Sequence, residues 1–272
     1  MNQLKVGLIG CGTIGNILAK AIDGWEDYEL AVIFDIKMKA AKNLYERMNK
    51  KPKIAPNFNE FLKEEKKLVV EAAIYKAVKD YGKKILETSD LMVMSTAAFV
   101  IYPELYSQLG NIAKEKGRKI FLPSGAVVGI DGIKSARDKI EEVTLITTKN
   151  PKSIEQTKYL TDRGIHLKDI QEKTVIFEGS AKEAPRYFPK NLNVASTLSF
   201  SGIGFEKTRV ILIADPNIKE NKHEIIAKGL FGEFKTQAKN IPSHSNPKTS
   251  YLAAFSAIAT LQKINDPFQI GT

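Results

Sequence analysis

The chain has 272 residues, of which 43% are hydrophobic and 26% are charged, a composition typical of a globular protein with a buried core. Its 41 lysines and arginines outnumber 31 aspartates and glutamates, which gives a formal net charge of +10 at pH 7. No apolar run approaches the ~20 residues of a membrane span, and the start MNQLKVGLIG lacks the features of a secretory signal. The single cysteine, Cys11, excludes an internal disulfide framework, so we expect a cytoplasmic protein with no membrane partner.

The positive charge raises the question of a nucleic-acid partner, because phosphates attract lysine and arginine. The excess is nearly all lysine, and it is mixed with acids in segments such as FLKEEKKL and KDYGKKILE. No helix-turn-helix, zinc or RNA-binding signature accompanies it. Solvated lysine-rich faces account for the charge, and we expect neither a nucleic-acid partner nor a metal site.

The first part of the chain alternates short apolar runs with helical periodicity. The predicted strands cover residues 4–10, 30–35, 68–73, 91–95 and 119–124. They are rich in Val, Ile and Leu without strict alternation, as in parallel strands covered on both faces. This pattern predicts an α/β domain over residues 1–124, a doubly wound parallel sheet of the Rossmann type.

After residue 124 the predicted strands are longer and alternate between apolar and polar residues. They cover residues 141–150, 172–179, 208–215 and 222–241, with helices at 153–162 and 193–202. Such alternation is typical of a mostly antiparallel sheet with one covered face. We therefore predict a second, α+β domain over 125–243, with the apolar helix of 244–272 docking back onto the first domain.

Three glycines, Gly10, Gly12 and Gly15, follow the first predicted strand and open a helix. This is the position of a dinucleotide-binding fingerprint, in which the first glycine makes the tight turn and the second admits the pyrophosphate. The third glycine lets the helix approach the strand, and the amides at the helix start attract the phosphates. A purely structural turn is the alternative.

The residues between these glycines belong to the same predicted cofactor site, and these are Cys11, Thr13 and Ile14. Thr13 can add a hydroxyl donor to the phosphates. Cys11 fits a small filler better than a nucleophile, because no histidine lies near it in the sequence.

Asp35 ends the second predicted strand, 35 − 15 = 20 residues beyond the last glycine. A carboxylate at this place accepts both ribose hydroxyls of the adenosine and repels a 2′-phosphate, so it favours NAD. Lys37 and Lys39 lie close enough to keep NADP open as an alternative.

Only three histidines can supply an imidazole, and these are His166, His223 and His244. His166 and His244 lie in polar connections, whereas His223 opens a strand and shares a face with Ile225 and Ala227. With an ordinary pKa of ~6.5, His223 is a candidate general base. A surface histidine with satisfied partners is the alternative.

Two further segments carry candidate binding residues. Ala126 lies between Gly125 and Gly129 where the two predicted domains join, a usual place for a ligand crevice. Asn193 stands at the start of a predicted helix, where it can cap the helix, bind a substrate carboxylate, or do both.

The chain resembles the L-aspartate dehydrogenase family along most of its length and in the family's order. The matching segments are GLIGCGTIG, VVEAA with AVKDYG, PSGAVVGIDGIKSAR, FPKNLNVASTLS, TRVILIADP with NKHEI, and NPKTSYLAAFSAIATLQ. The resemblance implies NAD(P)-dependent oxidation of L-aspartate to iminoaspartate, which hydrolyses to oxaloacetate and ammonia and feeds NAD biosynthesis. It also implies a homodimer, an active-site His223, and binding roles for Ala126 and Asn193.

Several alternatives share part of this pattern. Homoserine-dehydrogenase-like and dihydrodipicolinate-reductase-like enzymes have the same glycine turn and VEAA segment, whereas NKHEI and FPKNLNVAS favour aspartate. A dinucleotide sensor without catalytic activity is an alternative of another class. The segment STAAFV departs from the glycine-richer stretch expected after its strand, so the contacts near the nicotinamide are not predicted there.

Overall fold

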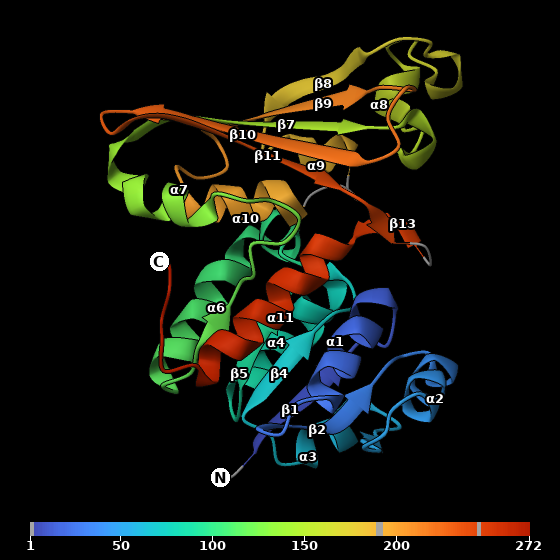
Figure 1. Cartoon of the computed structure of the whole chain (residues 1–272), viewed down its shortest axis with the longest axis vertical. Helices are drawn as coiled ribbons and strands as arrows, with labels where there is room; N and C mark the ends of the chain where they lie inside the picture. Colours follow the sequence, from blue (N-terminus) through green and yellow to red (C-terminus); the bar gives the residue numbers. More distant parts are fainter. Residues whose placement is uncertain (1–2, 189–192, 244–245) are drawn as a thin grey trace. The chain divides into compact units, whose positions relative to one another are not determined.

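The computed structural model describes residues 3–188, 193–243 and 246–272 (Figure 1). The chain divides into two compact units, Met1–Pro123 and Ser124–Thr272. This division lies one residue before the predicted boundary at 124. The docking of 244–272 onto the first domain stays a prediction.

A parallel six-stranded sheet forms the centre of the first unit, in the order β3-β2-β1-β4-β5-β6. Its strands are β1 (Leu4–Ile9), β2 (Tyr28–Phe34), β3 (Lys53–Ile54), β4 (Leu68–Glu71), β5 (Asp90–Val93) and β6 (Ile120–Phe121). The chain winds outward from β1 to β3 and then from β4 to β6, so the strand order reverses between β1 and β4. The doubly wound prediction is confirmed, while the two-residue edge strand β3 was not predicted.

Both faces of this sheet are covered, which is why its strands are apolar without alternation. Consecutive residues of a strand point to opposite faces, yet Val69 and Val70 are both fully buried, as are Val32 and Ile33. The helices of the unit are α1 (Thr13–Asp23), α2 (Met38–Glu46), α3 (Phe58–Lys63), α4 (Tyr75–Leu86), α5 (Ala98–Ile101) and α6 (Pro103–Glu115).

The second unit contains a five-stranded sheet in the order β11-β10-β7-β9-β8. Its strands are β7 (Ile140–Lys149), β8 (Thr174–Ser180), β9 (Thr208–Ala214), β10 (Asn221–Gly229) and β11 (Gly232–Asn240). Only β7 and β9 pair in parallel, so the prediction of a mostly antiparallel sheet is confirmed. A small two-stranded ladder, β12 (Pro242–Ser243) with β13 (Asn246–Ser250), follows.

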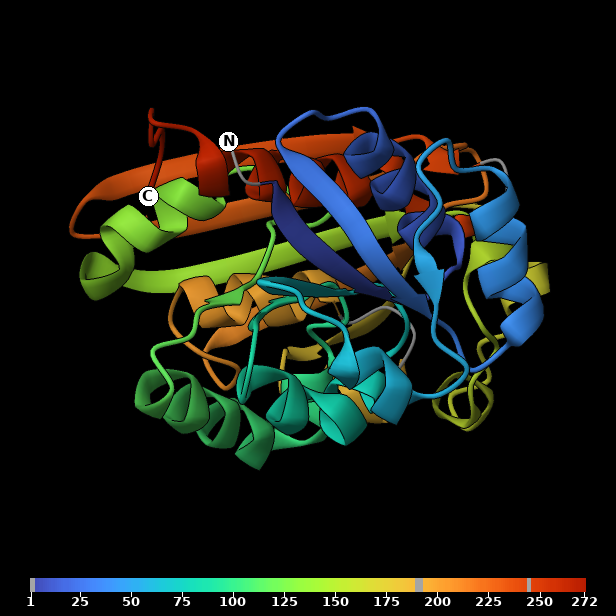
Figure 2. The ribbon, with the colours of Figure 1, turned by 90° about the horizontal axis from the view of Figure 1, so that it is seen from below.

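The single long strand predicted over 222–241 is wrong, because the segment is the hairpin β10–β11 (Figure 2). The turn consists of Leu230 and Phe231, and Gly229 pairs with Gly232 across it. Gly232 has a φ of +111°, a conformation that glycine adopts without a steric cost. Because the turn residues are apolar, the turn continues the strand pattern and gives no polar break in the sequence.

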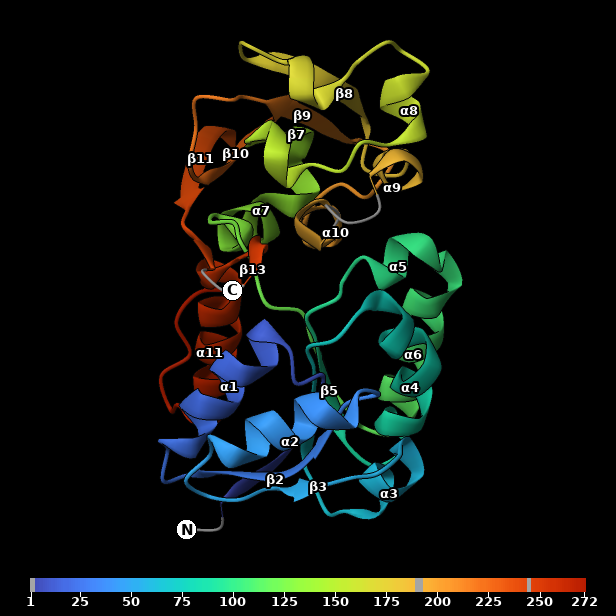
Figure 3. The same cartoon turned by 90° about the vertical axis from the view of Figure 1, so that its right-hand side faces the viewer.

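The helices of the second unit are α7 (Ile130–Ala136), α8 (Lys158–Thr161), α9 (Ala184–Tyr187), α10 (Asn193–Ser201) and α11 (Tyr251–Asn265). Three 3₁₀ turns accompany them, at Arg137–Lys139, Pro151–Ser153 and Leu167–Asp169. Helix α10 confirms the prediction at 193–202, α7 was not predicted, and the predicted helix at 153–162 shrinks to the four residues of α8. Figures 1 and 3 show α7 and α10 on the same side of the sheet.

Candidate active site

The glycine turn after β1 has the geometry that its three glycines predict. Gly10 adopts a φ of +96°, and a Cβ on it would lie 2.6 Å from the carbonyl oxygen of Ala72. A Cβ on Gly15 would lie 1.9 Å from the carbonyl oxygen of Gly10, so helix α1 lies directly against the turn. A Cβ on Gly12 would meet no atom within 4 Å, so this side of the turn is open to a ligand.

Asp35 is joined to this turn by a direct hydrogen bond. The Cys11 amide donates to Oδ2 of Asp35 at 2.8 Å, and the Lys37 amide donates to Oδ1 at 2.8 Å. Each carboxylate oxygen offers two acceptor sites, so each keeps one for a ribose hydroxyl. Cys11 and Asp35, 24 residues apart in the sequence, are therefore in contact in space, and the residues fit the adenosine half of a dinucleotide.

The residues inside the turn take the supporting places expected for them. Cys11 is buried, and burial together with the nearby Asp35 carboxylate raises the pKa of its thiol to about 12. The thiol is therefore neutral and unsuited to nucleophilic chemistry, in line with a filler. Thr13 and Ile14 are half-buried in the first turn of α1. Sequence reasoning missed Asn16, whose side-chain amide donates to the Cys11 carbonyl oxygen at 2.7 Å.

In the second unit His223 lies on the covered face of the sheet, where it is only 7% exposed. It pairs with Thr147 of β7 across the ladder, and the Thr147 hydroxyl lies 3.0 Å from Nδ1 of the imidazole. When Nδ1 carries the proton and donates to this hydroxyl, Nε2 keeps its lone pair. That tautomer is the one a general base requires.

Lys149 is a second buried ionisable residue beside this imidazole. It lies two residues after Thr147 on the same face of β7, and only 7% of its surface is exposed. Burial first, and then the positive charge of Lys149, lower the pKa of His223 to about 3. The imidazole is therefore neutral at neutral pH. The sequence carries one signal for Lys149, a lysine that follows Val143, Leu145 and Thr147 on one face of the strand.

Ala126 also belongs to this region of the second unit. Its carbonyl oxygen accepts a hydrogen bond from the side-chain amide of Asn240 at 2.8 Å, in a buried position on β11. Asn240 pairs with Asn221, which shares the covered face of β10 with His223. The Gly125 amide is held in addition by the Ser256 hydroxyl at 3.0 Å. The segment around Ala126 is therefore bound to β11, which pairs with β10, the strand of His223.

Asn193 is the first residue of α10, and its side chain is exposed. The four residues before it, 189–192, lie outside the described part of the chain, so its predicted capping role stays a prediction. The buried side of α10 packs against β9 and α7. The start of this helix is thus anchored in the same unit as His223.

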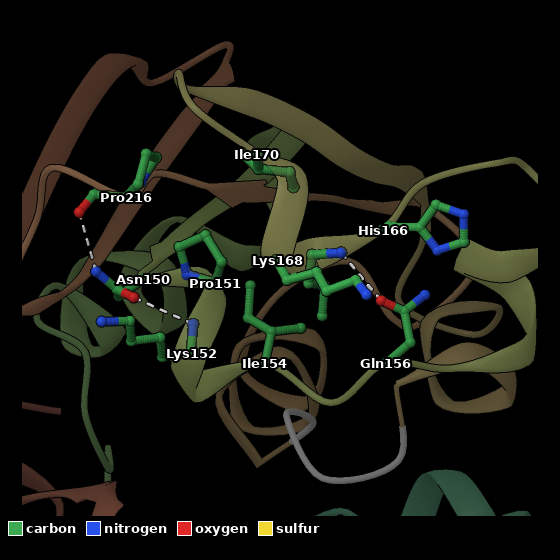
Figure 4. A pocket seen from close by; sticks show the side chains of 10 residues that line it. Asn150, Pro151, Lys152, Ile154, Gln156, His166, Lys168, Ile170 and Pro216 are labelled. Carbon is green, nitrogen blue, oxygen red and sulfur yellow. Dashed lines mark hydrogen bonds between the residues drawn. The ribbon is translucent and has the colours of Figure 1, made fainter.

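His166 takes no part in this cluster. His244 lies outside the described residues. His166 lines a separate cavity of about 630 Å³ near the β7 end, with Gln156 beside it and Asn150 and Pro216 on the opposite side (Figure 4). The side-chain amide of Asn150 binds the loops that line this cavity, since it donates a hydrogen bond to the Pro216 carbonyl oxygen at 3.1 Å.

Within residues 3–188, 193–243 and 246–272, no group of three or more His, Cys, Asp or Glu side chains is arranged to hold a metal ion. Among the helices that the structure describes, none combines the length and the apolar character needed to cross a bilayer.

The parallel sheet, the glycine turn and Asp35 define the first unit as a dinucleotide-binding domain of the Rossmann class, followed by an α+β unit. Residues 131–264 match the family model for aspartate dehydrogenase, C-terminal, and residues 10–123 match that for homoserine dehydrogenase, NAD binding domain. The chain belongs to the L-aspartate dehydrogenase family.

Relatives with this name align over nearly the whole chain. The L-aspartate dehydrogenase of Methanococcoides burtonii is 48% identical over 99% of this chain and 100% of its own length. That of Methanocaldococcus jannaschii is 38% identical over 99% of this chain and 100% of its own. The resemblance noted in the sequence is confirmed.

Solved structures agree with this assignment. The aspartate dehydrogenase of Thermotoga maritima superposes with a TM-score of 0.76 at 29% identity, covering 99% of this chain and 100% of its own. A myo-inositol dehydrogenase from Lactobacillus casei superposes with a TM-score of 0.55 at 16% identity, covering 99% of this chain and 89% of its own. The second likeness concerns the fold alone.

The electrostatic link between Lys149 and His223 gives a testable prediction. Replacing Lys149 with Met removes a positive charge that opposes protonation, so the pKa of His223 should rise while staying below its ordinary value, because burial remains. Imidazole NMR signals followed from neutral to acidic pH measure this shift. Lys152→Met, an exposed control in the cavity beside Asn150, should leave the His223 titration as in the wild type. If the pKa of His223 were the same in Lys149→Met as in the wild type, the electrostatic link would be contradicted.

Proposed function

We propose that this protein catalyses the NAD(P)-dependent oxidative deamination of L-aspartate. The products are iminoaspartate and, after hydrolysis, oxaloacetate and ammonia. The observation that carries the proposal is the buried neutral imidazole of His223 beside the buried Lys149. This pair occurs in a chain whose full-length relatives include L-aspartate dehydrogenases.

The first unit supplies the residues that would hold the dinucleotide. The open side of Gly12 and the first amides of α1 suit the pyrophosphate, and the remaining acceptor sites of Asp35 suit the ribose hydroxyls. The Asp35 carboxylate favours NAD over NADP, because it repels a 2′-phosphate. When bound, the oxidised nicotinamide takes the hydride from Cα of the substrate.

His223 manages the protons that accompany this oxidation. L-Aspartate enters as an ammonium, and the amine must lose a proton as the C=N bond forms. The neutral Nε2 of His223 can accept that proton, or the proton of the water that later attacks the imine, while Nδ1 is held by Thr147. Its low pKa before binding is due partly to Lys149, so a substrate carboxylate that offsets the charge of Lys149 makes His223 a stronger base.

Lys149 is also our candidate ligand for one of the two substrate carboxylates, with Ala126 and Asn193 placing the rest of the molecule. A largely desolvated ammonium binds a carboxylate more strongly than an exposed one does. Arg186 and Arg209 also flank the predicted site segments, and Arg209 forms an ion pair with Glu178 on strand β8. Arg209 is also exposed, so water weakens its attraction for a carboxylate more than it does for the buried Lys149.

The proposed reaction is tested by initial rates at the nicotinamide absorbance band. We expect L-aspartate with NAD⁺ to give the highest rate, with NADP⁺ slower and L-homoserine without turnover. L-Homoserine is the critical comparison, because the first unit matches a homoserine dehydrogenase domain model. Faster oxidation of L-homoserine than of L-aspartate would contradict the proposal, and NAD⁺ binding without any turnover would favour the sensor.

His223→Ala should lower kcat about 10²- to 10⁴-fold, because the positioned proton acceptor is lost. The Kd for NAD⁺ should stay near the wild-type value, since the glycine turn and Asp35 belong to the other unit. Stopped-flow and steady-state rates with L-aspartate measure the first effect, and calorimetric titration measures the second. His166→Ala is the matched control, and unchanged turnover in His223→Ala would remove this imidazole from the mechanism.

We propose that the protein forms a homodimer through the face of the second sheet opposite α7 and α10. Figure 1 shows α7 and α10 on one side of this sheet, and the opposite face carries half-buried isoleucines, Ile146, Ile211 and Ile226. A sheet face of this kind can pair with the same face of a second copy. In sedimentation velocity we expect a dimer that Ile211→Asp dissociates and Leu230→Asp, at the hairpin tip, does not. A monomeric wild-type chain would exclude this interface.

We further propose that the protein acts in the cytoplasm, where it supplies iminoaspartate for NAD biosynthesis. The single buried thiol of Cys11 needs no oxidising compartment. Growth of a bacterial strain unable to form iminoaspartate, on medium without nicotinate, tests this role by complementation.

A further inference from the structure

Glu71 is a buried acid that the proposed mechanism leaves unused. It is the last residue of β4, only 1% of its surface is exposed, and it stands in the VEAA segment at the carboxyl end of the parallel sheet. Strand β4 lies beside β1 at the point where the strand order reverses. In sheets of this class, ligands bind outside the carboxyl ends of the strands at that point.

The Glu71 carboxylate joins two loops at this edge. Its Oε1 accepts hydrogen bonds from the Ala73 amide at 2.9 Å and from the Ser95 hydroxyl at 2.8 Å, and its Oε2 accepts one from the Ser95 amide at 3.0 Å. Ala73 belongs to the loop after β4, and Ser95 belongs to the loop after β5. One side chain therefore holds both connections in place.

The loop after β4 is also the surface on which the glycine turn rests. A Cβ on Gly10 would lie 2.6 Å from the carbonyl oxygen of Ala72 and 2.8 Å from the amide nitrogen of Ala73. The Ala72–Ala73 peptide thus lies in contact with Gly10, and the Ala73 amide is held by Glu71. A continuous chain of contacts runs from Ser95 through Glu71 and Ala73 to the turn.

The donor set at Glu71 suits a carboxylate and no close substitute. Three donors converge on its two oxygens, whereas a glutamine would turn its NH₂ group toward one of them. Burial raises the pKa of Glu71 to about 7, while the hydrogen bonds from Ser95 and Ala73 lower it. Burying this group is costly, so an apolar residue would serve better if the position had only to fill space.

We propose that Glu71, with Ser95, is a positioning residue for the dinucleotide, holding the Ala72–Ala73 peptide as the support of the glycine turn. The inference rests on the proposed binding of NAD⁺ by that turn. Glu71 acts through Ala73 and Gly10, so its effect should fall on the dinucleotide and not on proton transfer.

The test is calorimetric titration of NAD⁺ into the full chain. Glu71→Gln should raise the Kd for NAD⁺ about tenfold, the effect of losing roughly one hydrogen bond to a charged group. Ser95→Ala keeps the backbone amide donor of residue 95, so it should raise the Kd for NAD⁺ only about threefold. Glu87→Gln is the matched control, because Glu87 lies in the same unit, is exposed, and forms a surface ion pair with Lys116.

Two readouts separate positioning from a general loss of stability. At saturating NAD⁺, kcat and the KM for L-aspartate should stay near wild type while the KM for NAD⁺ rises. In the variant that combines Glu71→Gln with Ser95→Ala, the Kd for NAD⁺ should be no higher than in Glu71→Gln alone. The two effects should not add, because both changes interrupt the same chain of contacts. Thermal unfolding followed by the single tryptophan, Trp25 in the first unit, identifies any variant that does not fold.

If Glu71→Gln does not fold, Ser95→Ala carries the test, since it removes only one of the three hydrogen bonds. If the wild type binds NAD⁺ and oxidises L-aspartate, folded variants with the wild-type Kd for NAD⁺ would overturn the role of Glu71. The proposed function would then stand. A wild-type chain that does not bind NAD⁺ would overturn the proposed function as well.

Discussion

The close approach of backbone to backbone at the glycine turn is the constraint on which the first unit depends. Helix α1 lies so near the Gly10 carbonyl that a Cβ on Gly15 would stand 1.9 Å from its oxygen. This contact directs the first amides of α1 past the end of β1, and the hydrogen bond from the Cys11 amide brings Asp35 to the same place. The loop after β4 supports the turn from its other side. A larger residue at Gly10 or Gly15 would separate all of these parts.

In the second unit, burial has the equivalent role. His223 and Lys149 share a covered sheet face, and the low exposure of both makes His223 sensitive to the charge of Lys149. Thr147 and Asn240 satisfy polar groups that burial would otherwise leave without partners, at Nδ1 of His223 and at the carbonyl oxygen of Ala126. The site is thus a small polar region on an otherwise apolar face.

The sequence predicted those features whose cause lies within a short stretch of chain. Apolar runs located the parallel strands, and glycine spacing located the turn, because close packing there admits no side chain. The same reasoning failed at Leu230 and Phe231, where an apolar turn does not differ from a strand, and at β3, which is only two residues long. The two glycines that flank the turn, Gly229 and Gly232, were the local signal for the hairpin, whereas β3 is too short to give one.

Sequence alone therefore determined the Rossmann class, the family, and the candidacy of Asp35 and His223, because fixed spacings and recognisable segments carry that information. Only the tertiary structure decided which side chains surround them. Thr147 lies 76 residues from His223 in the chain, and Ser95 lies 24 residues from Glu71. Strand register brings each pair together, and that register depends on the packing of the whole sheet rather than on the sequence near either residue.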